Sequence, residues 1–195
     1  MLNSLLGLII FGISIFSIEI QAEEDKYASV KDVIKTCFVC HGENGVSTQQ
    51  TYPILAGQEY YYLYVQLKDF KTGYRKNETM SPLASAMEKE QMQLIAKYFS
   101  EQTWPNSSHK VSADHIKLGK QVINAGQCVA CHLGAFKGNS RVPRLAQQHI
   151  EYLHKTMLDF KNKVRTNSPA KSSLFATFSD EEIEAVANYL SGFKE

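Results

Sequence analysis

All four cysteines of this 195-residue chain lie in two copies of one pattern, Cys-x-x-Cys-His. The copies are Cys37, Cys40 and His41, and Cys128, Cys131 and His132. Residues three positions apart lie about one turn apart on the same face of a helix, so the two thiols of a copy can react with one molecule. The histidine adds an imidazole, which is the commonest metal ligand among side chains. Each copy therefore combines two points of covalent attachment with one metal ligand.

This pentad is typical of covalent haem attachment. The two thiols form thioether bonds with the vinyl groups of one haem, and the histidine becomes the proximal ligand of its iron. Structural zinc sites also use cysteine pairs, but those pairs are usually about 15 to 20 residues apart, whereas Cys37 and Cys128 are 91 positions apart. A thioredoxin-type redox pair expects a βαβ surround, which this sequence does not offer. The pattern predicts two covalently bound haem c groups.

The pentads belong to an internal repeat. At the spacing of 91 positions Tyr98 corresponds to Tyr189, and between these anchors the spacing is 90. The pairs at a spacing of 90 are Pro53 and Pro143, Phe70 and Phe160, Arg75 and Arg165, and Asn77 and Asn167. A repeat of this length indicates two duplicated domains rather than a solenoid, whose units are about 20 to 50 residues long.

Both halves have the pattern of a short helical domain. A helical stretch precedes each pentad, and an aromatic-rich helix follows it, "GQEYYYLYVQLKDFK" in the first half and "QQHIEYLHKTMLDFK" in the second. The last helix is predicted to begin at Ser179, where Glu182 completes a capping box. Its apolar face consists of Ile183, Val186, Ala187 and Leu190. Because neither half shows the alternation of a strand, the predicted fold class is all-α.

The predicted boundaries follow from composition. Residues 1–22 hold an apolar run that is interrupted at Glu19, which is typical of a signal peptide cleaved after Ala22. The alternative is a retained membrane anchor, although a stable span needs about 20 apolar residues. The first domain is predicted at 23–103 and the second at 114–195. The polar linker 104–113 begins at Trp104, which either packs where the domains meet or lies near the surface.

Charge excludes one class of function. The chain has 21 basic and 20 acidic residues, which gives no sign of nucleic-acid binding. Lysines and arginines, Arg75 and Arg165 among them, occur in the segments "DFKTGYRK" and "DFKNKVR". They either attract acidic partners or haem propionates, or are solvated at helix ends.

The chain resembles diheme class I cytochromes c of the cytochrome c4 type over nearly all of its length after residue 22. The likeness rests on the two pentads, on "PILAGQEYYYLYVQLKDFKTGYR" and "PRLAQQHIEYLHKTMLDF", and on the closing helices "LIAKYF" and "AVANYL". It implies two tandem domains, each wrapped around one haem, in which the first and last helices cross.

The resemblance also implies roles for particular residues. Ala28 and Gly119 stand where a small residue permits contact with Tyr98 and Tyr189. Pro53 and Pro143 match the proline whose carbonyl accepts the Nδ1 proton of the proximal histidine. Such a bond fixes the orientation of the ring and tunes the iron.

The two halves differ in the expected sixth ligand of the iron. The resemblance implies a methionine before the last helix, and the first half supplies Met80, while Met87 and Met92 have the phase of core residues. At the corresponding place the second half has Lys171. Three outcomes stay open for that iron. Lys171 coordinates it through a neutral amine, the iron is five-coordinate or binds water, or one of three other side chains approaches it, His149, His154 or Met157.

The resemblance implies a periplasmic one-electron carrier rather than an enzyme. Its expected partners are redox proteins, namely a terminal oxidase, a reductase or a dehydrogenase, and peripheral association with a membrane is possible. The alternative is a diheme redox enzyme of the thiosulfate, tetrathionate or peroxide type that uses the unusually ligated second haem, or the electron-accepting subunit of such an enzyme.

Overall fold

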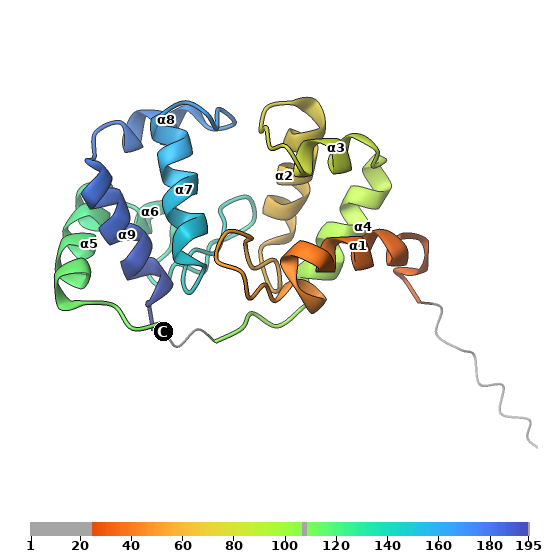
Figure 1. Cartoon of the computed structure of the whole chain (residues 1–195), viewed down its shortest axis with the longest axis horizontal. Helices are drawn as coiled ribbons and strands as arrows, with labels where there is room; N and C mark the ends of the chain where they lie inside the picture. The colour runs from red at the N-terminus through yellow and green to blue at the C-terminus, as the bar shows by residue number, and fades with distance from the viewer. Residues whose placement is uncertain (1–24, 107–108, 195) are drawn as a thin grey trace, which may run out of the picture.

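The computed structural model describes residues 25–106 and 109–194. The predicted signal peptide, residues 1–22, lies outside the described residues. Two groups of helices stand side by side and are connected by the segment that follows α4 (Figure 1). The first group comprises η1 (Ala28–Val30), α1 (Lys31–His41), η2 (Glu43–Gly45), α2 (Tyr60–Thr72), α3 (Met80–Ser85) and α4 (Lys89–Ser100). The second comprises α5 (Ala113–Ala125), α6 (Val129–His132), α7 (Ile150–Lys161), α8 (Pro169–Phe175) and α9 (Asp180–Ser191).

The all-α prediction is confirmed. Over the described ranges the chain forms no strand, and the only β contact there is an isolated bridge between Asn139 and Val142. No helix of these same ranges has the length and apolar character needed to cross a membrane.

Each half has a hydrophobic core of its own. The buried core of the first half consists of Val30, Ile34, Leu63, Met87, Met92, Ile95, Ala96 and Phe99. That of the second consists of Val122, Ile123, Phe136, Ala146, Leu153, Met157, Ile183, Val186, Ala187 and Leu190. The predicted apolar face of α9 is therefore buried, and Met87, Met92 and Met157 are core residues as predicted.

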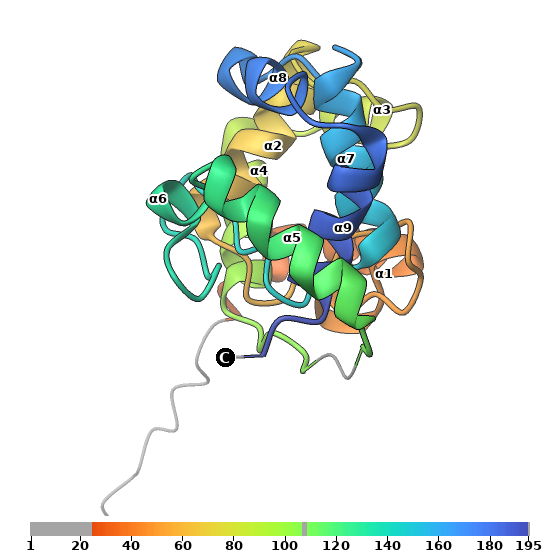
Figure 2. The same cartoon turned by 90° about the vertical axis from the view of Figure 1, so that its left-hand side faces the viewer.

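The first and last helices of the second half cross closely. Figure 2 shows α5 in front of α9, against which it packs. A Cβ atom on Gly119 would lie 2.7 Å from the Ala185 carbonyl oxygen and 2.7 Å from Cβ of Tyr189. The predicted role of Gly119 is confirmed. The capping box is present too, because Glu182 N donates to Ser179 Oγ and Ser179 N donates to Glu182 Oε2.

The matching contact of the first half is made differently. Ala28 lies in η1 and is exposed. The ring of Tyr27 packs edge-on against Tyr98, with the centroids 5.1 Å apart. The neighbouring Val30 is only 1% exposed. Because η1 replaces the first turns of the predicted helix, an aromatic pair supplies the contact expected from a small residue at Ala28.

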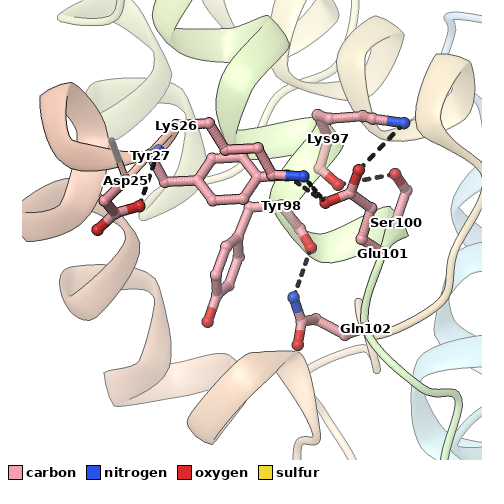
Figure 3. Close-up of polar contacts among 8 residues, drawn as sticks. All are labelled: Asp25, Lys26, Tyr27, Lys97, Tyr98, Ser100, Glu101 and Gln102. Carbon is pink, nitrogen blue, oxygen red and sulfur yellow. Dashed lines mark hydrogen bonds and ion pairs between the residues drawn. The ribbon is translucent and has the colours of Figure 1, made fainter. Parts of the chain in front are cut away.

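Polar contacts hold this N-terminal turn to the end of α4 (Figure 3). Glu101 Oε2 accepts hydrogen bonds from Lys26 Nζ at 2.7 Å and from the Tyr27 hydroxyl at 2.5 Å. Its other oxygen lies 3.3 Å from Lys97 Nζ. The bonds from Lys26 and Tyr27 lower the pKa of Glu101 to about 2.

The two halves meet through loops and through the segment after α4. The Trp104 ring lies 4.8 Å from the Arg144 guanidinium carbon of the second half. The Trp104 backbone also covers Gly57 of the first half so closely that a Cβ atom there would lie 2.9 Å from Trp104 N. Of the two alternatives for Trp104, packing at the meeting of the halves is the one observed.

Candidate haem-binding sites

The two pentads are carried by helices of different form. In the first half α1 runs without a break through Cys37, Cys40 and His41. In the second half α5 ends at Ala125, Gln127 takes a left-handed conformation with φ 49°, and α6 then begins beside Cys128. Both arrangements place the second cysteine and the histidine in one helical turn. None of the four cysteines forms a disulfide, and burial raises the pKa of the Cys37 thiol to about 11.

The two histidines have the same carbonyl partner. His41 Nδ1 lies 2.9 Å from the Pro53 carbonyl oxygen, and His132 Nδ1 lies 2.9 Å from that of Pro143. An imidazole Nδ1 that donates to a carbonyl has its Nε2 free as a metal ligand. Burial lowers the pKa of both rings, and that of His132 falls to about 4 with the nearby Lys171 charge contributing. Both rings are therefore neutral at pH 7, as metal binding requires.

Both histidines face one cavity. It has a volume of about 520 Å³ and extends through both halves. Cys37, Cys40, His41 and Met80 line it from the first half, and His132 and Lys171 from the second. Its apolar lining includes Leu63, Phe70, Ile95, Phe99, Leu153, Met157, Phe160 and Phe175.

Met80 and Lys171 occupy corresponding places. Met80 is the first residue of α3, which packs on α2, and Lys171 is the third residue of α8, which packs on α7. The Lys171 amine lies 5.8 Å from the centroid of the Phe160 ring. Burial, followed by the Arg165 charge, lowers the pKa of Lys171. The structure thus brings Lys171 to the cavity that His132 also faces.

The other candidates in the second half have other contacts. His149 Nε2 lies 2.9 Å from the Ser47 carbonyl, and its Nδ1 lies 3.2 Å from Gln50 Nε2, so both ring nitrogens engage the first half. His154 lies on α7 and is partly buried. Met157 is packed in the core, 6% exposed, although it also contributes to the cavity wall.

The sequence did not predict how the cations converge between the halves. Gln66 Oε1 accepts from Arg75 Nη1 at 2.9 Å and from Arg165 Nη2 at 2.6 Å. The same guanidinium groups lie over the rings of Phe70 and Phe160, at 4.6 and 4.5 Å from the centroids. Arg165 is 6% exposed, so it is not a solvated residue at a helix end. The recurrence of arginine at positions 75 and 165 was the only sign of this cluster in the sequence.

Tyrosines complete this cluster. The Tyr152 hydroxyl accepts from Arg75 Nη2 at 3.2 Å. Burial raises the pKa of Tyr62, and the charges of Arg165 and Arg75 partly oppose that rise. Burial opposes ionisation of Tyr152, but the charges of Arg75 and Arg165 outweigh it and lower its pKa. Two neighbouring cations repel each other, so the cluster suits an anionic group in the cavity.

The residues of this cavity fit a c-type haem. The first pentad lines it with the Cys37 and Cys40 thiols and with His41, whereas only His132 of the second pentad does so, because Cys128 and Cys131 lie outside the lining. Both imidazoles are held by a carbonyl, the walls are apolar, and the clustered arginines suit the two propionate carboxylates of a haem. Within 25–106 and 109–194, no three histidine, cysteine, aspartate or glutamate side chains form a group that could hold a metal ion.

Comparisons with known proteins agree with this chemistry. The family model of cytochrome c matches residues 116–194. The chain is 32% identical to cytochrome c4 of Thiocapsa roseopersicina, over 82% of this chain and 88% of that protein. It is 30% identical to a protein of Stutzerimonas stutzeri named thiosulfate dehydrogenase electron acceptor, over 80% of this chain and 77% of that protein.

A solved structure extends the likeness to the fold. The crystal structure of reduced recombinant cytochrome c4 from Pseudomonas stutzeri superposes with a TM-score of 0.77 at 29% identity, covering 85% of this chain and 97% of that chain. The resemblance seen in the sequence is confirmed, as is the prediction of an electron carrier rather than an enzyme. This chain belongs to the cytochrome c4 family of electron-transfer proteins.

Proposed function

We propose that this chain is a periplasmic diheme cytochrome that carries single electrons between respiratory redox proteins. The observation that carries the proposal is the duplicated pair of pentad histidine and proline carbonyl, which faces one apolar cavity from both halves. When bound, each haem supplies a couple of ferric and ferrous iron. The expected donors and acceptors are a dehydrogenase on one side and a terminal oxidase or reductase on the other.

The chain's own residues hold and tune these groups. Cys37 and Cys40 attach one haem and Cys128 and Cys131 the other. His41 and Met80 are the proposed ligands of the first iron. His132 and Lys171 are those of the second. The apolar walls exclude water, and Arg75 and Arg165 hold propionate charge between the two sites.

Replacing Met80 tests the ligand assignment of the first site. Methionine ligation favours the ferrous state and raises the potential, so Met80→Ala should lower the potential of the first haem. It should also abolish the sulfur-to-iron charge-transfer band of the ferric protein. A spectrum-resolved redox titration measures both, with Met92→Leu in the core as the matched control. Retention of the band in Met80→Ala would refute the assignment.

The electron-accepting subunit of a thiosulfate-oxidising enzyme is a second candidate. The relative named thiosulfate dehydrogenase electron acceptor favours it. Mixing the oxidised protein with a thiosulfate dehydrogenase and thiosulfate, and following haem reduction in a stopped-flow instrument, tests this role. Rapid reduction that depends on the enzyme supports it, and reduction no faster than with thiosulfate alone excludes it for that enzyme.

A catalytic second haem is the remaining alternative, and carbon monoxide discriminates it from a carrier. Lys171 bound to the iron makes the second site slow to bind carbon monoxide, whereas an open site binds it at once. We expect the reduced protein to bind it slowly at both sites. Rapid binding at the second haem favours an enzyme of the thiosulfate, tetrathionate or peroxide type.

Export and domain boundaries complete the proposal. We propose cleavage after Ala22, domains at 23–103 and 114–195, and a linker at 104–113. The contacts of Lys26 and Tyr27 with Glu101 support a folded domain that begins shortly after the cleavage point. N-terminal sequencing of the periplasmic protein should give Glu23 first, whereas recovery of Met1 in the membrane fraction indicates a retained anchor.

A further inference from the structure

The loops that hold the two histidines meet at the interface between the halves. Gln148 of the second half is 2% exposed and contacts Ile54 of the first at two points. Ile54 N donates to Gln148 Oε1 at 2.9 Å, and Gln148 Nε2 donates to the Ile54 carbonyl at 3.0 Å. Ile54 directly follows Pro53, whose carbonyl is the partner of His41.

The reverse contact is made by the corresponding glutamine. Gln58 of the first half is 4% exposed. Arg144 N donates to Gln58 Oε1 at 2.8 Å, and Gln58 Nε2 donates to the Arg144 carbonyl at 3.0 Å. Arg144 follows Pro143, the partner of His132. The two glutamines are 90 positions apart, the same spacing as the two prolines.

One rigid group connects each glutamine with the histidine of the opposite half. The carbonyl of Pro53 and the N–H of Ile54 belong to a single planar peptide unit. His41 donates to one end of this unit, and the other end donates to Gln148. Hydrogen bonds in such a chain polarise one another. An acceptor on the N–H therefore makes the carbonyl a stronger acceptor for the imidazole.

We propose that Gln58 and Gln148 are positioning residues that act across the interface, each holding the peptide unit that orients and polarises the proximal histidine of the opposite half. The inference rests on the proposed roles of His41 and His132 as iron ligands. Its consequence is that part of the potential of each haem is determined by the other half of the chain. A stronger bond at Nδ1 makes the imidazole more basic and favours ferric iron. Loss of the glutamine must then raise the potential.

The test is a crossed pattern of potentials. Methionine has similar length and no amide, so Gln148→Met should raise the potential of the haem held by His41 and leave that of the His132 haem close to the wild-type value. Gln58→Met should do the reverse. We expect the reduction equilibrium to shift about three- to tenfold, where tenfold corresponds to 59 mV for one electron. Shifts confined to the haem of the substituted half, or equal at both haems, overturn the inference.

A matched control removes interface contacts of another kind. Gln50 also bridges the halves, through His149 Nδ1 and Ile150 N, but it touches neither peptide unit that follows a proline. Gln50→Ala should leave both potentials unchanged. If it reproduces the shifts of the Gln148→Met protein, loosening of the interface is their cause and the inference fails.

Nuclear magnetic resonance of the reduced protein gives a readout that general destabilisation does not move. In Gln148→Met the Nδ1 proton of His41 should shift upfield and exchange faster, while that of His132 keeps its position. If the variants do not fold, the wild-type protein provides the test, because a scalar coupling must connect Ile54 N with the Gln148 side-chain carbonyl carbon. Absence of that coupling overturns the inference.

The outcome is separable from that of the proposed function. If the wild-type protein shows neither two haem couples nor imidazole ligation, the proposed function is wrong, and this inference is wrong with it. Two normal couples in the wild type together with uncrossed shifts in the variants would remove this inference alone.

Discussion

Lys171 shows how a single side chain can make two similar sites chemically different. A free lysine has a pKa of about 10.4, so a neutral amine at pH 7 costs about 4 to 5 kcal/mol. Burial and the charge of Arg165 lower the pKa of Lys171 and so reduce this cost. The two sites share the same imidazole and carbonyl geometry. Among the proposed iron ligands, the two sites therefore differ only at the position of Met80 and Lys171.

Lys171→Met should make the second site resemble the first. We expect the potential of the second haem to rise toward that of the first, and the sulfur-to-iron charge-transfer band to gain about twofold in intensity. A redox titration followed by absorption measures both. An unchanged band and potential would mean that the side chain at position 171 does not reach the iron.

Residues of the site differ in how far the sequence could predict them. The pentads were predictable from their residue types and their recurrence, and the roles of Pro53 and Pro143 from the family resemblance, because each contact is made within one repeat. The contacts of Gln66 with Arg75 and Arg165 were not, because they depend on how two separately folded halves dock. Periodicity carries no information about that docking.

The contact between the first and last helices is built differently in the two halves. The helices of the two halves therefore differ in how sensitive they are to substitution. In the second half the backbone of α5 approaches α9 at Gly119 without space for a side chain. Overpacking of a tight core contact typically costs 1–3 kcal/mol. In the first half the aromatic pair of Tyr27 and Tyr98 replaces this contact.

Gly119→Ala should therefore destabilise the second half by about 1–3 kcal/mol. The measurement is the denaturant midpoint of the haem-containing protein. Gly134→Ala is the control, because a Cβ atom there would meet no atom within 4 Å, and its midpoint should stay near that of the wild type. Equal midpoints for the two variants would contradict close contact at the α5–α9 crossing.

The contacts of the N-terminal turn with Glu101 contribute to the stability of the fold in a pH-dependent way. The folded pKa of Glu101 is about 2, below its ordinary value of 4.5. A group with a depressed pKa stabilises the fold above its unfolded pKa, and this contribution is lost as the pH falls toward the folded value. The stabilisation is therefore complete above about pH 4.5 and disappears between there and pH 2.

Glu101→Gln should lower the melting temperature at pH 6, and the difference from the wild type should narrow as the pH falls from 4.5 toward 2. Comparing the two proteins at each pH removes acid effects that they share. Lys35→Gln, at an exposed ion pair on α1, is the control and should show a much smaller difference throughout. A difference that stays constant from pH 6 to pH 2.5 would contradict the role of Glu101.

The two halves share one cavity and one cluster of cations. Arg75 comes from the first half and Arg165 from the second, and both donate to Gln66. A positive charge near a haem favours the ferrous state, since reduction adds a negative charge. A unit charge about 10 Å away contributes on the order of 1 kcal/mol inside a protein.

Arg75→Gln should accordingly lower the potentials of both haems, by about fivefold in the reduction equilibrium for 1 kcal/mol. Lys68→Gln on the exposed face of α2 removes the same charge from solvent and should have little effect. The potentials come from the same titration as above. A change at the first haem alone would show that the charge of Arg75 is not felt in both halves.

For the whole molecule, the sequence predicted the duplication from the spacing of the repeat and the all-α class from the periodicity of apolar residues. It left the position of Trp104 open between two alternatives, because a linker has no periodic pattern to place it. The structure puts this ring against Arg144.

Trp104 is the single tryptophan of the chain, and it rests on Gly57 of one half and on Arg144 of the other. Porphyrins quench indole emission by energy transfer, so a closed molecule with haem on both sides is nearly dark. Any opening between the halves moves the indole away from one quencher and increases its fluorescence. Trp104 fluorescence of the haem-containing protein should therefore report any separation of the two halves.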